Sequence, residues 1–256
     1  MKIKFHYTYI IISLGFILSG YFSNLIVFTS IIIIHELGHS IIAKINNLDV
    51  QEITIYPFGG LTKINAPLNT NTNVEIKVAM AGITFQTIYY FIILFLYKNN
   101  LIREYIFNEF TIYNKNIFFL NLLPIHPLDG SIILTSLLSK FIPYKLSLKL
   151  NTIISVIVLI IILKLHIYKF NYTLILIFFV ILKNLIEYHN LIEYKFNKFL
   201  LERYLYPKIY FKTAKITKVT NMYKEKYNLF KKKNSYIGEK QVLKEKFTSK
   251  TSKIFD

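Results

Sequence analysis

The chain has 256 residues, of which 54% are hydrophobic, with a mean hydropathy of +0.42 and a formal net charge of +17. Several long apolar runs exclude an ordinary soluble domain and predict an integral membrane protein. The sequence contains no cysteine, which excludes disulfides and thiolate metal ligands.

Six membrane spans are predicted along the chain. The first follows a short basic segment, Met1–His6, and because no small-residue cleavage pattern follows we interpret it as a retained span rather than a signal peptide. The fourth contains Pro124 and Pro127, which should interrupt it. The predicted spans are Tyr7–Tyr21, Leu25–Ile45, Val78–Tyr97, Phe110–Leu138, Leu150–Ile167 and Tyr172–Tyr188. The predicted fold class is therefore an all-α polytopic membrane protein.

A short β-hairpin is predicted between the second and third spans. Glu52–Tyr56 and Leu61–Ile64 have strand character, and Pro57-Phe58-Gly59-Gly60 has the composition of a turn. A free strand edge beside the membrane could hold an extended substrate. Phe58, Gly59 and Gly60 are therefore candidate substrate-binding residues, and a plain connecting turn is the alternative.

The C-terminal segment is strongly basic. Residues 191–256 contain 17 of the 31 Lys and Arg residues against six acidic ones. The positive-inside rule then predicts that both termini are cytoplasmic in a bacterial cell membrane. We expect a membrane-embedded domain over residues 1–190 and a cytoplasmic tail over residues 191–256. The tail is either a shortened regulatory domain or a solvated helical extension. Its charge indicates contact with anionic lipid rather than nucleic acid, because no nucleic-acid-binding motif is present.

The second span contains the pentapeptide His35-Glu36-Leu37-Gly38-His39. On a helix the two histidines lie on one face, close enough to share a metal ion. A bare acidic residue at the centre of a membrane helix costs roughly 2.5 to 3.5 kcal/mol, so Glu36 needs a compensating partner. One zinc ion bound by His35 and His39, with Glu36 holding a water, is favoured over a buried polar cluster.

Catalytic zinc usually takes three protein ligands. The fourth span supplies candidates between Asn121 and Gly130, where two prolines release the backbone from helical hydrogen bonding. Asp129 is the predicted third ligand, and His126 is its competitor. Asn121 is a candidate substrate-binding residue, or alternatively a cap of the broken helix.

These two motifs together resemble the site-2 protease family of intramembrane zinc metalloproteases. In that family an HExxH helix is paired with a later Asn-x-x-Pro-x-x-Pro-x-Asp-Gly segment. The matching residues here are Asn121, Pro124, Pro127, Asp129 and Gly130. The resemblance extends through the Pro57–Gly60 turn and covers roughly residues 1–205. It implies that Asp129 completes the zinc site, that Asn121 orients the substrate, and that Glu36 is the general base for a metal-activated water.

The compact hairpin makes the chain most similar to the sporulation branch, which cleaves a membrane-associated sigma-factor precursor. The resemblance implies an endopeptidase for a membrane-tethered regulatory precursor, a pro-sigma factor, with membrane-protein regulators. Ala81-Gly82-Ile83 departs from the family's Ala-Gly-Pro, and Ser131 replaces a common second glycine. The tail is also short for the cystathionine-beta-synthase-type domain of that branch. The alternatives are clearance of anti-sigma factors or signal-peptide remnants, and a non-catalytic membrane metal-binding protein.

Overall fold

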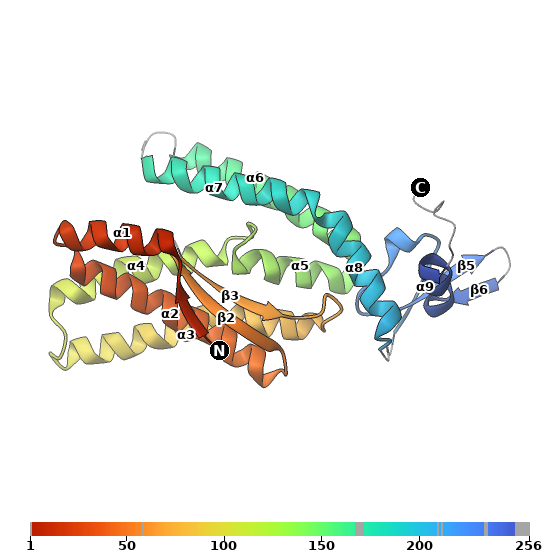
Figure 1. Cartoon of the computed structure of the whole chain (residues 1–256), viewed down its shortest axis with the longest axis horizontal. Coiled ribbons are helices and arrows are strands. Elements are labelled where there is room, and N and C mark those ends of the chain that lie inside the picture. Colours follow the sequence, from red (N-terminus) through yellow and green to blue (C-terminus); the bar gives the residue numbers. More distant parts are fainter. Residues whose placement is uncertain are drawn as a thin grey trace. The chain divides into compact units, whose positions relative to one another are not determined.

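The computed structural model describes residues 2–57, 59–166, 172–208, 210, 212–232 and 235–248 (Figure 1). The chain divides into two compact units, Met1–Ala66 with Ile76–Leu123, and Pro67–Glu75 with Pro124–Asp256. The helices are α1 (Tyr7–Leu18), α2 (Phe22–Ile45), α3 (Thr72–Lys98), α4 (Glu104–Leu122), α5 (Asp129–Phe141), α6 (Tyr144–His166), α7 (Tyr172–Asn190), α8 (Ile192–Leu205) and α9 (Glu239–Thr248), with a 3-10 turn η1 (Val219–Asn221). The strands are β1 (Lys2–Phe5), β2 (Asp49–Tyr56), β3 (Gly59–Asn65), β4 (Thr213–Ile216), β5 (Tyr227–Lys232) and β6 (Ser235–Gly238).

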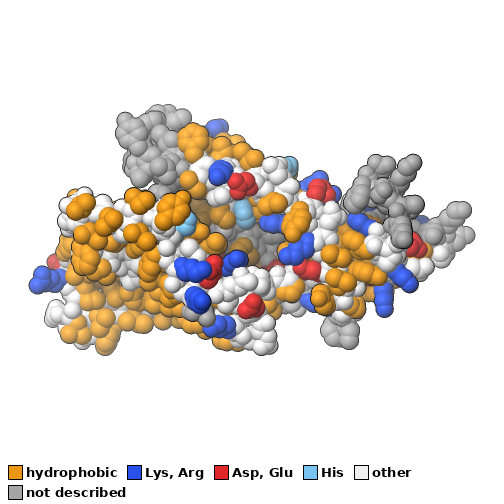
Figure 2. Space-filling view, viewed as in Figure 1, with side chains coloured by type: hydrophobic (Ala, Val, Ile, Leu, Met, Phe, Trp, Pro, Cys, Tyr) orange, Lys and Arg blue, Asp and Glu red, His pale blue; other side chains and the backbone are white. Residues whose placement is uncertain are grey.

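Among the residues that the structure describes, three helices are long and apolar enough to cross a bilayer: α2, α3 and the Tyr144–Lys164 part of α6. Hydrophobic side chains cover most of the visible face of the first unit's helices (orange in Figure 2), as expected for a surface that meets lipid. The shorter α1 is also apolar. The chain is therefore mostly helical and suited to a membrane, while the count of six spans and the orientation of the termini stay predictions.

The predicted interruption of the fourth span is present. Helix α4 ends at Leu122 and α5 begins at Asp129, and the residues between them, which include Pro124 and Pro127, are not helical. Proline lacks a backbone donor and clashes with the preceding turn, which explains the break. Asp129 consequently stands in the first turn of a new helix rather than in the middle of an old one.

The predicted hairpin is present and is larger than expected. Strands β2 and β3 pair antiparallel, with Tyr56 opposite Gly59, and a register shift lies between Val50 and Glu52. Strand β1, which was not predicted from the sequence, pairs parallel with β2 and precedes α1. The sheet order β1-β2-β3 makes β3 an edge strand within the described residues.

Helix α2 is the centre of the first unit. Ile32 packs with Ile53 and Ile55 of β2 in one buried cluster, and Ile31 packs with Phe110 of α4 in another. Burial on two sides explains why α2 has apolar residues around most of its circumference. The motif at its C-terminal half is thereby held against the hairpin.

The described part of the C-terminal segment is folded. Strands β4, β5 and β6 form a second three-stranded sheet, with β4 and β5 parallel and β5 and β6 antiparallel. A hydrophobic cluster joins this sheet to α8 and α9 through Phe199, Phe230 and Leu243. The all-α prediction therefore missed a small α/β subdomain, which we call the C-terminal subdomain (residues 192–248). The predicted boundary between residues 190 and 191 stays a prediction.

Candidate metal centre

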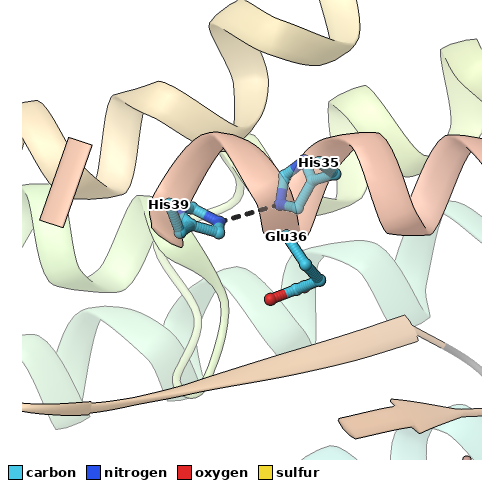
Figure 3. Close-up of side chains that lie close together, drawn as sticks. All are labelled: His35, Glu36 and His39. Atoms are coloured by element: carbon cyan, nitrogen blue, oxygen red, sulfur yellow. Dashed lines mark hydrogen bonds between the residues drawn. The ribbon is translucent and has the colours of Figure 1, made fainter. Parts of the chain in front are cut away.

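His35, Glu36 and His39 form the one group of three potential metal ligands found among the described residues (Figure 3). Their ligand atoms all lie within 4.8 Å of one another, and all three residues are buried. They come from consecutive turns of α2. The helical spacing in the sequence therefore produces the expected cluster.

The ring orientation of His39 is fixed by α3. Its Nδ1 lies 2.8 Å from the backbone carbonyl oxygen of Val78. A carbonyl only accepts hydrogen bonds, so Nδ1 carries the proton and donates it to that oxygen. In the neutral ring Nε2 of His39 is then the unprotonated nitrogen, which is the form that binds a metal.

The same reasoning fixes His35 through an amide relay. The Gln86 side chain donates from Nε2 to the backbone carbonyl of Asn114 at 2.8 Å, which sets the orientation of the amide. Its Oε1 therefore faces His35 and lies 3.1 Å from Nδ1 of the ring. Because Oε1 only accepts, Nδ1 of His35 donates, and in the neutral ring Nε2 then carries the lone pair.

The two Nε2 atoms face each other at 3.1 Å. Two acceptor nitrogens at this separation repel one another unless a proton or a cation joins them. Two nitrogens that each bind one zinc at roughly 2.0 to 2.1 Å in a tetrahedral site lie about 3.3 Å apart. The histidine pair therefore fits a shared metal ion, and its outer hydrogen bonds are of the kind that orient metal-binding imidazoles.

Glycines allow α3 and α2 to approach closely at this point. A Cβ on Gly82 would lie 2.4 Å from Nε2 of His39 and 2.7 Å from Nε2 of His35. A Cβ on Gly38 would lie 2.6 Å from the carbonyl oxygen of Ala81. Any side chain at Gly82 would therefore displace the two nitrogens.

Glu36 is held from the side of the hairpin. The Thr62 hydroxyl lies 2.7 Å from Oε2 of Glu36 and donates to it, and a Cβ on Gly60 would lie 2.4 Å from Cγ of Glu36. Figure 3 shows the carboxylate projecting away from the helix axis beside the two rings. Glycine at position 60 thus lets β3 lie directly against the carboxylate.

The other predicted site residues lie in separate parts of the chain. Asn121 is half-buried near the end of α4, and Gly59 begins β3 opposite Tyr56. Asp129 is half-buried in the first turn of α5, in the second unit, whereas His35 and His39 are in the first. Phe58 lies outside the described residues.

His126, the competing third ligand, has an aromatic partner. Its ring centroid lies 4.1 Å from that of Tyr188, and its backbone N–H donates to the Ser155 hydroxyl at 3.3 Å. The imidazole is thus packed as part of the second unit.

The residues that orient the histidines were not predicted from the sequence. Gln86 is fully buried, and the Val78 carbonyl is a backbone group that no residue type reveals. An amide inside an apolar run is costly in a membrane, so Gln86 was detectable as a residue in need of a buried partner. Thr62 looked like an ordinary strand residue and gave no such signal.

Residues 23–104, which contain α2, the hairpin and most of α3, match the model of peptidase family M50. Over these residues the chain is therefore similar to peptidase family M50, the family of the site-2 proteases. The match covers the two histidines, Glu36 and the α3 residues that contact them.

Individual relatives agree with this assignment. The chain is 35% identical over 152 residues to stage IV sporulation protein FB of Bacillus subtilis (strain 168), which covers 59% of this chain and 52% of the relative. It is 27% identical over 122 residues to a zinc metalloprotease of Methanocaldococcus jannaschii, covering 46% of this chain and 35% of that protein. The chain thus spans about half or less of the length of these curated relatives.

The fold is also found in a solved structure. The site-2 protease from Methanocaldococcus jannaschii matches with a TM-score of 0.57 and 24% sequence identity, covering 72% of this chain and 89% of that one. This likeness extends the common fold well beyond the residues that match the family model.

Proposed function

We propose that the protein is an intramembrane zinc endopeptidase that hydrolyses a peptide bond of a membrane-tethered regulatory precursor, a pro-sigma factor. The observation that carries the proposal is the pair of Nε2 atoms, 3.1 Å apart, with a buried carboxylate beside them. The match to peptidase family M50 supports the reaction class. The similarity to a stage IV sporulation protein supports the sporulation branch as the source of the substrate.

The chemistry follows from the roles of the three side chains. Zinc, when bound, acts as a Lewis acid toward the scissile carbonyl and toward water. His35 and His39 would hold it through Nε2, because their Nδ1 atoms donate to Gln86 and Val78. Glu36 accepts the proton from the attacking water and returns it to the leaving amine. The Thr62 hydroxyl, at 2.7 Å, keeps one carboxylate oxygen in place during this transfer.

Asp129 is our proposed third ligand. It stands in the first turn of α5, directly after the proline-containing break. The ring contact between His126 and Tyr188 supports this choice, because it gives the competing imidazole a packing role. Asn121 remains the proposed substrate-orienting residue.

The edge of β3 is the proposed substrate-binding strand. Gly60 lies against Glu36, so a peptide that adds to the sheet at Gly59 and Gly60 would run close to the general base. Strand addition would also keep the substrate extended, which exposes its carbonyls to attack. We further propose that the substrate is a membrane-tethered protein and that membrane-protein regulators act on the enzyme. Both termini of the enzyme are proposed to be cytoplasmic.

The experiment is cleavage of a candidate pro-sigma factor by the purified full-length chain in detergent, with zinc titrated. Glu36→Gln should lower the cleavage rate by about 10²- to 10⁴-fold, the usual contribution of a general base. Zinc content, measured by elemental analysis, should stay at one ion per chain. Glu52→Gln is the matched control, since Glu52 lies in the same hairpin region but pairs with Lys4, and it should cleave normally. Equal processing by wild type and Glu36→Gln would reject the proposal.

The ligand assignment has its own test. Asp129→Ala should lose zinc, and His126→Ala should retain it. The opposite pattern would make His126 the third ligand.

A further inference from the structure

The segment between the hairpin and α3 is held by the C-terminal subdomain. Residues 67–75 belong to the same compact unit as that subdomain, although the rest of α3 belongs to the first unit. Thr72 is 1% exposed and Asn69 is 4% exposed. The backbone N–H of Asn69 donates to Glu202 of α8 at 3.1 Å. The N-terminus of α3 is therefore built into the C-terminal subdomain.

Two adjacent residues of a single loop hold the first turn of α3. Glu225 accepts the backbone N–H of Thr72 at 2.7 Å, and an acidic group at this position also complements the helix dipole. Lys224 pairs with Glu75, with 2.5 Å between Nζ and Oε1. The Lys224 side chain is only 2% exposed. A lysine is almost never buried without a partner, so the burial of Lys224 depends on the charge of Glu75.

Arg203 fixes the loop that makes these contacts. Its side chain is fully buried and donates from Nη1 to the carbonyls of Tyr223 and Lys224, at 3.0 and 2.9 Å. Its Nε pairs with Glu239 at 3.0 Å. We call residues 223–226 the clamp loop. Its geometry is set by the core of the C-terminal subdomain rather than by solvent-exposed side chains.

Glu75 also reaches a second helix. Its other carboxylate oxygen, Oε2, accepts a hydrogen bond from the Ser136 hydroxyl of α5 at 2.8 Å. Ser136 is 3% exposed and lies two helical turns after Asp129, the proposed third ligand. One carboxylate thus joins the clamp loop, α3 and α5.

On α3, Glu75 shares a face with the groups that orient the histidines. Val78, Gly82 and Gln86 follow it at three, seven and eleven residues, the spacing of one face of a helix. Val78 and Gln86 bind the two Nδ1 atoms, and Gly82 faces the two Nε2 atoms. A rotation or axial shift of α3 would therefore move the partners of both imidazoles together.

We propose that Glu75 is a positioning residue through which the clamp loop sets α3 and α5 for zinc binding and catalysis. This inference rests on the proposed function for its catalytic part. Its metal-binding part rests only on the contacts of the histidines with α3. The C-terminal subdomain, in this view, is a structural requirement for the metal centre.

The test compares zinc affinity and turnover in the full-length protein. Glu75→Gln keeps the shape of the side chain but leaves Lys224 buried without its opposite charge. We expect its zinc dissociation constant, measured by chelator competition, to rise about tenfold, the lower end of the effect of outer-sphere substitutions. At saturating zinc, kcat should fall while KM for the substrate stays constant.

A double variant keeps the test valid if the single variant does not fold. Glu75→Gln with Lys224→Gln removes both charges of this pair, so neither is left buried without its partner; folding should be retained while the link to α3 and α5 is weakened. It should show the same loss of zinc affinity and the same fall in kcat. The matched control is Glu193→Gln, which breaks the Lys145–Glu193 pair at a 62% exposed carboxylate in the same subdomain. It should behave as wild type.

The outcomes separate the two proposals. Wild-type zinc affinity and kcat in a folded Glu75 variant, single or double, would overturn the positioning role. Zinc binding by the wild type without cleavage would reject the proposed protease function, and the affinity comparison would still decide the role of Glu75. Failure of the wild type to bind zinc would overturn both.

Discussion

Two regions of this molecule bury charged or titratable groups, and they do so in different ways. In the C-terminal subdomain, buried Arg203 meets Glu239 at 3.0 Å, and Glu239 in turn accepts from both nitrogens of Asn228 at 2.9 Å. On α2, the buried Glu36 meets a hydroxyl, and the two neighbouring imidazoles are turned so that their acceptor nitrogens face each other. The first arrangement is an ion pair closed by hydrogen bonds, and the second has the ligand types and the spacing of a metal site.

The difference separates structural from reactive polar clusters. An ion pair whose hydrogen bonds are all made inside the protein contributes rigidity and has nothing to offer a ligand. A histidine pair whose Nδ1 atoms are held by hydrogen bonds, and whose Nε2 atoms face each other, has the geometry to bind a metal. The number of buried charges alone would not distinguish the two.

The largest effect is expected where the acceptor nitrogens are pushed apart. Gly82→Ala places a methyl group 2.4 Å from Nε2 of His39, so the rings must move and zinc content should fall from one ion per chain towards none. Gly15→Ala is the control, because a Cβ on that helical glycine has nothing within 4 Å and should not affect zinc. Full zinc content in Gly82→Ala would show that the site tolerates another arrangement.

Removing Arg203 tests the buried ion pair of the C-terminal subdomain, the other region of the comparison. Arg203→Met leaves Glu239 buried without its partner, and such a loss costs about 3 to 5 kcal/mol. We expect rapid tryptic cleavage within the C-terminal subdomain. Lys198→Met, which removes a 4.0 Å pair from a half-exposed lysine of α8, should change stability by less than about 0.5 kcal/mol. Equal protease resistance of the two variants would contradict the structural role of Arg203.

A smaller effect is expected when the orientation of one histidine is loosened. Gln86→Met removes the acceptor for Nδ1 of His35, so zinc affinity should fall by about 10- to 100-fold. Chelator competition measures it, and Gln241→Met on the exposed face of α9 serves as the control. Unchanged affinity would mean that the Asn114 to Gln86 to His35 relay does not tune the metal site.

The sequence allowed prediction of the local parts of this site. The four-residue spacing of His35 and His39 needs only a helix to bring the rings together. The proline-containing break and the hairpin also follow from short-range rules, and the structure has both. Each of these features depends on residues that are close in the chain.

The parts that were missed depend on contacts between distant segments. The register of α3 against α2 decides which α3 groups contact the imidazoles. The close approach of the two helices at Gly38 and Gly82 sets that register. Strand β1 pairs with β2 across fifty residues, and its four alternating residues, Lys2–Phe5, are too short a run to identify a strand. The C-terminal subdomain was not predicted because its sequence is rich in lysine. Only a few apolar residues, such as Phe199 and Leu243, form its core.

The smallest predicted effect is a pH dependence of the C-terminal subdomain. Burial lowers the pKa of Lys195 on α8 from 10.5 to about 8, and its Nζ lies 3.9 Å above the ring of Tyr188. The folded state therefore binds this proton more weakly than the unfolded state does. Below pH 8 the lysine is charged in both states and the full cost of burying the charge is present. As the pH rises from about 8 to 10.5 that cost disappears, so this residue's contribution to stability increases with pH.

Lys195→Met should remove this part of the pH dependence. Protease resistance of the variant should exceed that of the wild type below pH 8, and the two should converge as the pH approaches 10.5. The sign distinguishes Lys195 from a paired lysine such as Lys224, whose charge is matched by Glu75 and whose loss should weaken the fold. A variant less resistant than wild type below pH 8 would mean that the contact with Tyr188 outweighs the cost of burying the charge.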